Sequence, residues 1–150
     1  MGNRDGAELV RILLAEDDDD DFYLTERALK ENRVRNDISR VKDGEELMRY
    51  LRGAGEFKGV GRPAEPSLVL LDLNMPKMDG REALREIKSD PILRHIPVVV
   101  LTTSRAEEDV IRSYEIGVNS FITKPLTFQG LVEAMKALGQ YWFEVVALPR

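Results

Sequence analysis

Side chains that can do chemistry stand at the ends of several apolar segments of this 150-residue chain. Glu16 and Asp17 follow one such segment directly, and Asp72 lies within the end of another. Thr102 closes a third segment, and Lys124 follows a fourth. Carboxylates can act as nucleophiles or hold cations, whereas a hydroxyl and an ammonium group donate hydrogen bonds to anions. In an open parallel sheet the ligand site lies at the carboxyl ends of the strands, so we expect these side chains to converge there.

Six consecutive carboxylates, from Glu16 to Asp21, make the acidic side of this pattern unusual. Carboxylates this close together repel one another, and a cation relieves that repulsion. Neighbouring strands lie about 4.8 Å apart. If the strands that end at Glu16 and Asp72 are neighbours, Glu16, Asp17 and Asp72 can share one hard cation, for which Mg²⁺ is our prediction. The later aspartates, Asp18 to Asp21, are expected to start and cap a helix.

The composition excludes several classes of protein. A net charge of −5 and a pI near 5.1 argue against binding to nucleic acid or to an anionic membrane surface. The absence of cysteine excludes disulfides and thiolate chemistry, and a single histidine excludes a centre with several histidine ligands. No apolar run is long enough to span a membrane, and the first ten residues do not resemble a secretory signal. We therefore expect a soluble cytoplasmic protein.

Short apolar segments alternate with segments of helical spacing along the chain. The predicted strands are apolar on both faces, as in a parallel sheet covered on both sides, and lie at Val10–Ala15, Ile38–Val41, Ser67–Leu73, Pro97–Thr103 and Ser120–Thr123. The predicted helices carry apolar residues between Phe22 and Leu29, Leu47 and Leu51, Ala83 and Ile87, Val110 and Tyr114, and Phe128 and Trp142. This alternation predicts an α/β fold with a doubly wound five-stranded parallel sheet. A long surface loop is expected from Arg52 to Pro66.

Four segments in this order, "ILLAEDD", "LVLLDLNMPKMDG", "PVVVLTTS" and "SFITKP", resemble the receiver domain of two-component response regulators. The resemblance extends from Arg11 to about Leu138. It implies a flavodoxin-like sheet of strand order 2-1-3-4-5. It also implies that the chain accepts a phosphoryl group from a histidine of a partner kinase and is not an enzyme in the usual sense, catalysing only its own phosphorylation and autodephosphorylation.

The resemblance assigns roles to individual residues. Asp72 corresponds to the phosphoacceptor, and Glu16 and Asp17 correspond to the acidic pair that holds Mg²⁺. Asn74 corresponds to the residue whose backbone carbonyl is a further metal ligand. Lys124 corresponds to the lysine that contacts the phosphoryl group. The residue types support the same chemistry, because phosphoryl transfer depends mainly on positioning and on neutralising charge.

A second group of residues would transmit the structural change that follows phosphorylation. Thr102 corresponds to the switch hydroxyl that moves toward the phosphoryl group, and Phe121 to the aromatic side chain that then changes rotamer. Burial of an aromatic ring in the core explains Phe121 equally well. The Lys124–Pro125 bond would be trans by the general preference of such bonds, whereas the resemblance favours cis at Pro125.

The chain continues beyond the expected receiver with "GQYWFEVVALPR". We expect one receiver domain over residues 1–150, with an N-terminal extension at 1–9 and an extended C-terminal helix at 139–150, acting alone by switching protein contacts. The apolar tail favours a homodimer through the last helix and the strand at 120–123, or a tail that folds over its own core. The long loop, "TTSRAEED" and "YWFEVVALP" are similar to regulators that serve phytochrome-type sensor histidine kinases. The sequence does not specify the downstream partner.

Two other classes of function remain open. A phosphohydrolase could use an aspartyl-phosphate intermediate on a similar sheet, but Asn74 cannot serve as the general acid that such enzymes place two residues after the nucleophile. An interaction module that no longer accepts phosphate is the other alternative, and the complete set of Glu16, Asp17, Asp72, Thr102 and Lys124 argues against it.

Overall fold

The computed structural model describes residues 10–31, 36–53, 66, 68–73, 75, 77–102, 120–123, 125 and 127–141. Within these ranges the strands are β1 (Val10–Ala15), β2 (Asn36–Val41), β3 (Leu68–Asp72), β4 (Val98–Thr102) and β5 (Ser120–Thr123). The helices are α1 (Asp19–Glu31), α2 (Gly44–Arg52), α3 (Gly80–Ser89) and α5 (Phe128–Tyr141). The helix predicted around 110–114, most of the predicted loop at 52–66 and the tail after Tyr141 lie outside the described residues.

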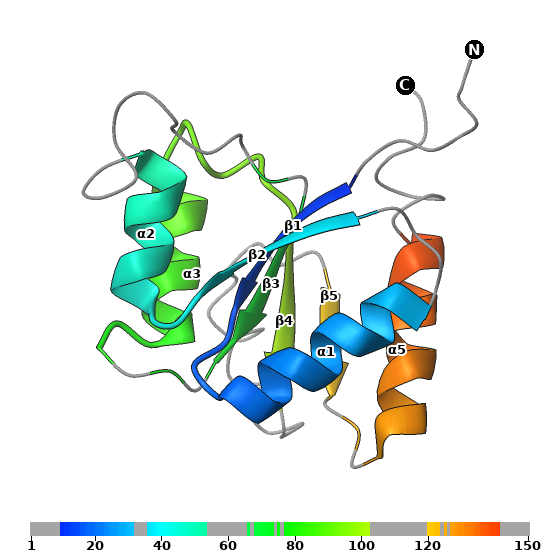
Figure 1. Ribbon diagram of the computed structural model, residues 1–150. Coiled ribbons are helices and arrows are strands. Elements are labelled where there is room, and N and C mark those ends of the chain that lie inside the picture. Colours follow the sequence, from blue (N-terminus) through cyan, green and yellow to red (C-terminus); the bar gives the residue numbers. More distant parts are fainter. Residues whose placement is uncertain are drawn as a thin grey trace.

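The strands form one parallel sheet in the order β2-β1-β3-β4-β5. Helices α2 and α3 cover one face of the sheet, and α1 and α5 pack together on the other (Figure 1). The predicted α/β fold with a parallel sheet is therefore confirmed. The adjacency of β1 and β3 matters most for function, because it brings the residues after Ala15 beside the end of β3.

Alternation of side chains along β1 explains why the sheet is buried on both faces. Leu13 and Ala15 join an apolar cluster under α2 and α3, whereas Ile12 and Leu14 join a second cluster under α1 and α5. All five residues of β3 are buried. Successive residues of a strand point to opposite faces, so a continuous apolar run satisfies both layers of helices at once.

Local hydrogen bonds cap the ends of helices α2 and α3. Asp43 and Asp79 are the N-caps of α2 and α3, and their carboxylates accept hydrogen bonds from the backbone of Glu46 and Glu82. Gly53 ends α2 with a left-handed φ of 68°, a conformation that suits glycine. In the described part of the chain, no helix has the length and apolar character needed to cross a membrane.

We expect an Asp43→Ala variant to lose about 1 kcal/mol of unfolding free energy, because the backbone N–H of Glu46 loses its acceptor. That hydrogen bond is 2.8 Å long, and the Asp43 side chain is largely buried. Urea denaturation of this variant and of Asp43→Asn, which keeps an acceptor oxygen, measures the effect. Equal stability of the two variants would contradict the capping role.

Candidate functional site

Two strand ends meet at the carboxyl edge of the sheet. Ala15 is paired with Leu71, so the next residues along these parallel strands, Glu16 and Asp72, stand beside each other. Carboxylate oxygens of Glu16, Asp17 and Asp72 all lie within 4.8 Å of one another. The structure thus brings together the three carboxylates whose convergence the strand ends predict.

The three carboxylates differ in their exposure. Glu16 is 1% exposed and Asp72 is 4% exposed, whereas Asp17 is exposed to solvent. Burial penalises charged carboxylates and proximity adds mutual repulsion, and a cation offsets both costs. Oxygen donors at this spacing suit a hard divalent cation, which can enter from the side of Asp17. The cluster therefore fits a divalent metal.

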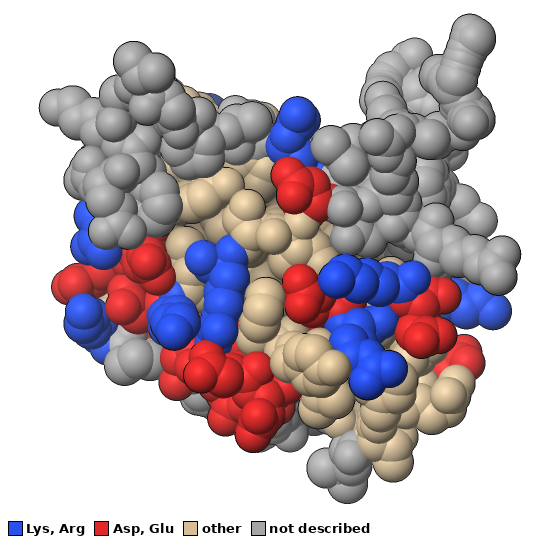
Figure 2. All heavy atoms as spheres, in the orientation of Figure 1, with Lys and Arg blue, Asp and Glu red and all other residues tan. Residues whose placement is uncertain are grey.

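The remaining aspartates of the acidic run organise the start of α1. The carboxylate of Asp18 accepts a hydrogen bond from the backbone N–H of Asp21 at 2.9 Å, and α1 begins at Asp19, as predicted. Glu16 Oε2 in turn accepts from the backbone N–H of Asp18 at 3.2 Å. Acidic side chains gather on the surface where α1 begins (Figure 2). Only the first part of the run therefore belongs to the cluster.

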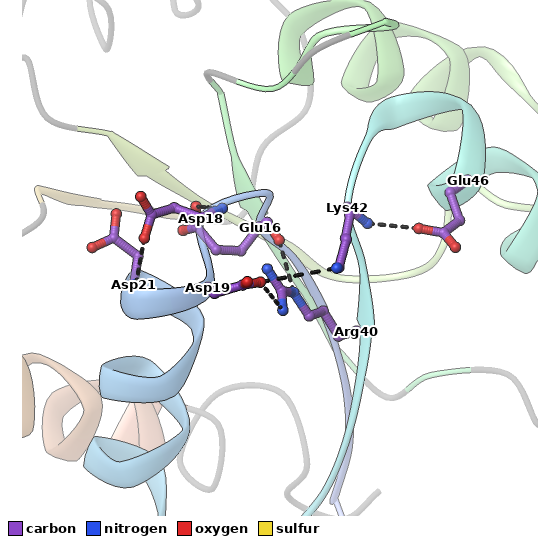
Figure 3. Close-up of polar contacts among 7 residues, drawn as sticks. All are labelled: Glu16, Asp18, Asp19, Asp21, Arg40, Lys42 and Glu46. Carbon is purple, nitrogen blue, oxygen red and sulfur yellow. Dashed lines mark hydrogen bonds and ion pairs between the residues drawn. The ribbon is translucent and has the colours of Figure 1, made fainter.

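Arg40 of β2 reaches across this acidic loop and was not predicted from the sequence. Its Nε donates to the backbone carbonyl of Glu16 at 3.0 Å, and its Nη1 lies 2.8 Å from Asp19 Oδ1 (Figure 3). The hydrogen bond from Arg40 lowers the pKa of the Asp19 carboxyl, with further contributions from the charges of Lys42 and Arg40. A usable signal does exist in the sequence, because Arg40 shares a strand face with the apolar Ile38.

The other predicted site residues are described only in part. Thr102 ends β4 and pairs with Thr123, the last residue of β5, so both backbones reach the edge where the acidic cluster lies. The side chains of Thr102 and Phe121 lie outside what the structure describes, as do Asn74 and Lys124. The described residues contain no cis peptide bond, and the Lys124–Pro125 bond is not among them. The roles of these residues stay predictions.

Comparison with known proteins places this geometry in a family. Residues 12–136 match the response regulator receiver domain. Response regulator Rcp1 of Synechocystis sp. is 44% identical over 138 residues, which cover 92% of each chain. Among solved structures, the Mn²⁺-bound form of Rcp1 superposes with a TM-score of 0.80 at 42% identity and covers 94% of this chain and 99% of its own.

A further structure, of the phosphorylated cyanobacterial phytochrome response regulator RcpA, has a TM-score of 0.83 and 43% identity. The match covers 95% of this chain and 100% of that one. Identity at this level over nearly the whole of both chains reflects common descent as well as a shared fold. The acidic cluster at the sheet edge, the family match and these relatives agree, and the chain belongs to the response regulator receiver domain family.

Proposed function

We propose that this response regulator accepts a phosphoryl group on Asp72 from a sensor histidine kinase, with Mg²⁺ bound, and thereby changes which proteins it contacts. The observation that carries the proposal is the position of Asp72. It is a buried carboxylate at a strand end, with the oxygens of Glu16 and Asp17 within 4.8 Å. Burial beside like charges is unfavourable for a carboxylate, so this position suits a residue that binds a cation and not an ordinary surface aspartate.

The proposed transfer is a substitution at phosphorus. A carboxylate oxygen of Asp72 forms the new O–P bond while the N–P bond of the kinase's phosphohistidine breaks, and the electron pair of that bond stays with the departing imidazole. A bound Mg²⁺ supplies charge neutralisation for the phosphoryl oxygens. Glu16, Asp17, Asp72 and the backbone carbonyl of Asn74 would hold it, and self-catalysed hydrolysis of the acyl phosphate would reset the protein.

The switch proposed here uses the neighbouring strands. Lys124 and the Thr102 hydroxyl donate hydrogen bonds to phosphoryl oxygens, and Phe121 turns inward as Thr102 moves. Support comes from the strand ends, because β4 and β5 finish at the same edge of the sheet as β3. A group carrying about two negative charges and several acceptor oxygens is a sufficient stimulus for such a local rearrangement.

The metal proposal predicts a selective loss of affinity. We expect an Asp17→Asn variant to bind Mn²⁺ at least about tenfold more weakly, equivalent to about 1.4 kcal/mol, because one of three clustered negative charges is removed. Electron paramagnetic resonance of free Mn²⁺ measures this directly. The matched control is Asp18→Asn, which removes a neighbouring charge while keeping a helix-capping side chain. Equal losses in both variants would point to a diffuse acidic surface instead.

The partners follow from the relatives and from the sequence. Because the relative RcpA is named a phytochrome response regulator, we propose a phytochrome-type histidine kinase as phosphodonor and an unidentified protein as downstream target. We also propose a homodimer through α5 and β5. A concentration series by light scattering, with and without phosphodonor, tests it, and a constant monomer mass would exclude it.

The proposed organisation is one receiver domain over residues 1–150, located in the cytoplasm. The family match over residues 12–136 supports it and lies between the proposed extensions at residues 1–9 and 139–150. A chain without cysteine is compatible with a reducing compartment.

Intact-mass measurement after incubation with Mg²⁺ and a small phosphodonor tests the central proposal. We expect a single added phosphoryl group, and none when the metal is removed with EDTA. Turnover of many donor molecules per protein each second would favour the phosphohydrolase. No modification in the presence of metal would favour an interaction module.

A further inference from the structure

We infer that Arg40 is a positioning residue for the metal cluster, holding the loop after β1 in its binding geometry. The inference rests on the metal site proposed above. Arg40 lies on β2, paired with Leu14 of β1, two residues before Glu16. Its side chain is 17% exposed and lies on the same strand face as Ile38, which packs against the cluster under α1 and α5.

The backbone of Glu16 is hydrogen-bonded to β2 on both sides of the residue. Its N–H donates to the carbonyl of Val41 at 3.0 Å, and its carbonyl accepts from Arg40 Nε at 3.0 Å. Both backbone groups of this cluster residue are therefore held by β2, one through the main chain and one through the guanidinium. Fixing the peptide on both sides limits how far the Glu16 carboxylate can move before a cation arrives.

The guanidinium of Arg40 points across the loop toward the start of α1. Besides the carbonyl of Glu16, it contacts the carboxylate of Asp19 in the first turn of α1 (Figure 3). It also lies over the ring of Phe22, 4.6 Å from the ring centroid. The planar guanidinium of Arg40 thus connects Glu16, at the start of the loop, to Asp19, at the start of α1. It also engages Asp19, a carboxylate next to the cluster but outside it.

Stability alone does not account for an arginine at this position. Arg40 Nη2 is buried and has no hydrogen-bond partner among the described residues. An unpaired buried donor is unfavourable, and an apolar side chain would suit a face that also carries Ile38. Arg40→Met keeps a flexible stem against Phe22 and removes the unpaired donor, but it also removes the donor to the Glu16 carbonyl. We therefore expect a modest decrease in the unfolding midpoint together with weaker metal binding.

Two physical effects of Arg40 on a cation have opposite signs. Its positive charge repels the cation, so removing the charge alone would tighten binding. Its hydrogen bond and ion pair order the loop, so removing them weakens binding. Lys42 provides a matched control, because its Nζ lies 3.9 Å from the same Asp19 carboxylate and, within the described structure, its side chain makes no hydrogen bond or ion pair to Glu16. Lys42→Met therefore measures the charge effect separately.

The experiment is Mn²⁺ titration, followed by electron paramagnetic resonance, of the wild type, Arg40→Met, Arg40→Lys and Lys42→Met. We expect the dissociation constant to rise about tenfold in Arg40→Met, the scale seen when groups that orient metal ligands are removed. The dissociation constant should also rise in Arg40→Lys, because a single ammonium group cannot replace the planar guanidinium, which contacts Glu16 and Asp19 together. In Lys42→Met the dissociation constant should stay equal or fall.

Unchanged or tighter binding in Arg40→Met would overturn the inference and leave the proposed metal site intact. If Arg40→Met does not fold, Arg40→Lys decides in the same way. Absence of Mn²⁺ binding in the wild type would instead overturn the metal site itself, together with this inference. The metal dependence of phosphorylation gives a second readout, in which the half-saturating Mg²⁺ concentration rises and the rate at saturating Mg²⁺ stays within about twofold.

Discussion

An Asp72→Asn variant is expected to gain no phosphoryl mass under conditions in which the wild type is fully modified. The amide nitrogen and oxygen of asparagine are poor nucleophiles, although the side chain has nearly the same size. In a well-studied protease, loss of the nucleophile costs on the order of 10⁶ in rate. Even a much smaller decrease in rate would leave no detectable phosphorylated protein within the time of an intact-mass experiment.

The fold of this variant should be intact, which makes the result interpretable. Removing the charge of the buried Asp72 relieves repulsion with Glu16 and Asp17, so the thermal midpoint should stay the same or rise in the absence of metal. Asp20→Asn, the same chemical change at an exposed position of the acidic run, is the control and should be modified like the wild type. Phosphorylation of Asp72→Asn would show that another carboxylate is the acceptor.

The sequence predicts most of the described sheet because parallel strands leave a strong apolar signal. The bounds of β1 and β5 are those expected, and β3 and β4 end within one residue of the prediction. The edge strand β2 begins at Asn36 rather than Ile38, because Asn36 and Asp37 are polar and contribute no apolar pattern. Polar residues at the start of an edge strand leave no apolar pattern, so the start of β2 is hard to predict from hydropathy.

The acidic cluster was predictable for a similar reason. Strand ends of a parallel sheet meet at one edge, so Glu16, Asp17 and Asp72 follow from the strand assignments and the adjacency of β1 and β3. Arg40 was not predictable to the same degree, since its importance depends on where a long flexible side chain ends. Its contacts with Glu16 and Asp19 require the three-dimensional path of the loop.

The close packing behind the acceptor was also missed, and it involves glycine. Gly80 begins α3, and its backbone N–H donates to the carbonyl of Leu73 at 3.0 Å, which closes the loop after β3. A Cβ added at Gly80 would lie 2.5 Å from the carbonyl oxygen of Asp72 and 2.6 Å from the Cα of Leu73. Both atoms belong to the backbone, so no side-chain rotation relieves the overlap.

We therefore expect Gly80→Ala to lower the unfolding free energy by about 3 kcal/mol, at the upper end of the usual cost of overpacking. For a chain of this size the thermal midpoint would fall by roughly 6–12 °C. This expected loss of stability is opposite to the intrinsic helix preference, because alanine is favoured over glycine by up to about 1 kcal/mol in a helix interior. Glu82→Ala, an exposed change in the same first turn, should alter stability by less than about 0.5 kcal/mol.

The same substitution should also slow phosphorylation, because the backbone that must yield is that of Asp72 itself. A displacement near 1 Å at a reacting group can cost about a hundredfold in rate, so we expect a decrease between about tenfold and a hundredfold at a temperature where the variant is folded. Wild-type stability in Gly80→Ala would mean that α3 moves away without cost. Wild-type phosphorylation in a destabilised variant would mean that the loop yields and the acceptor strand does not.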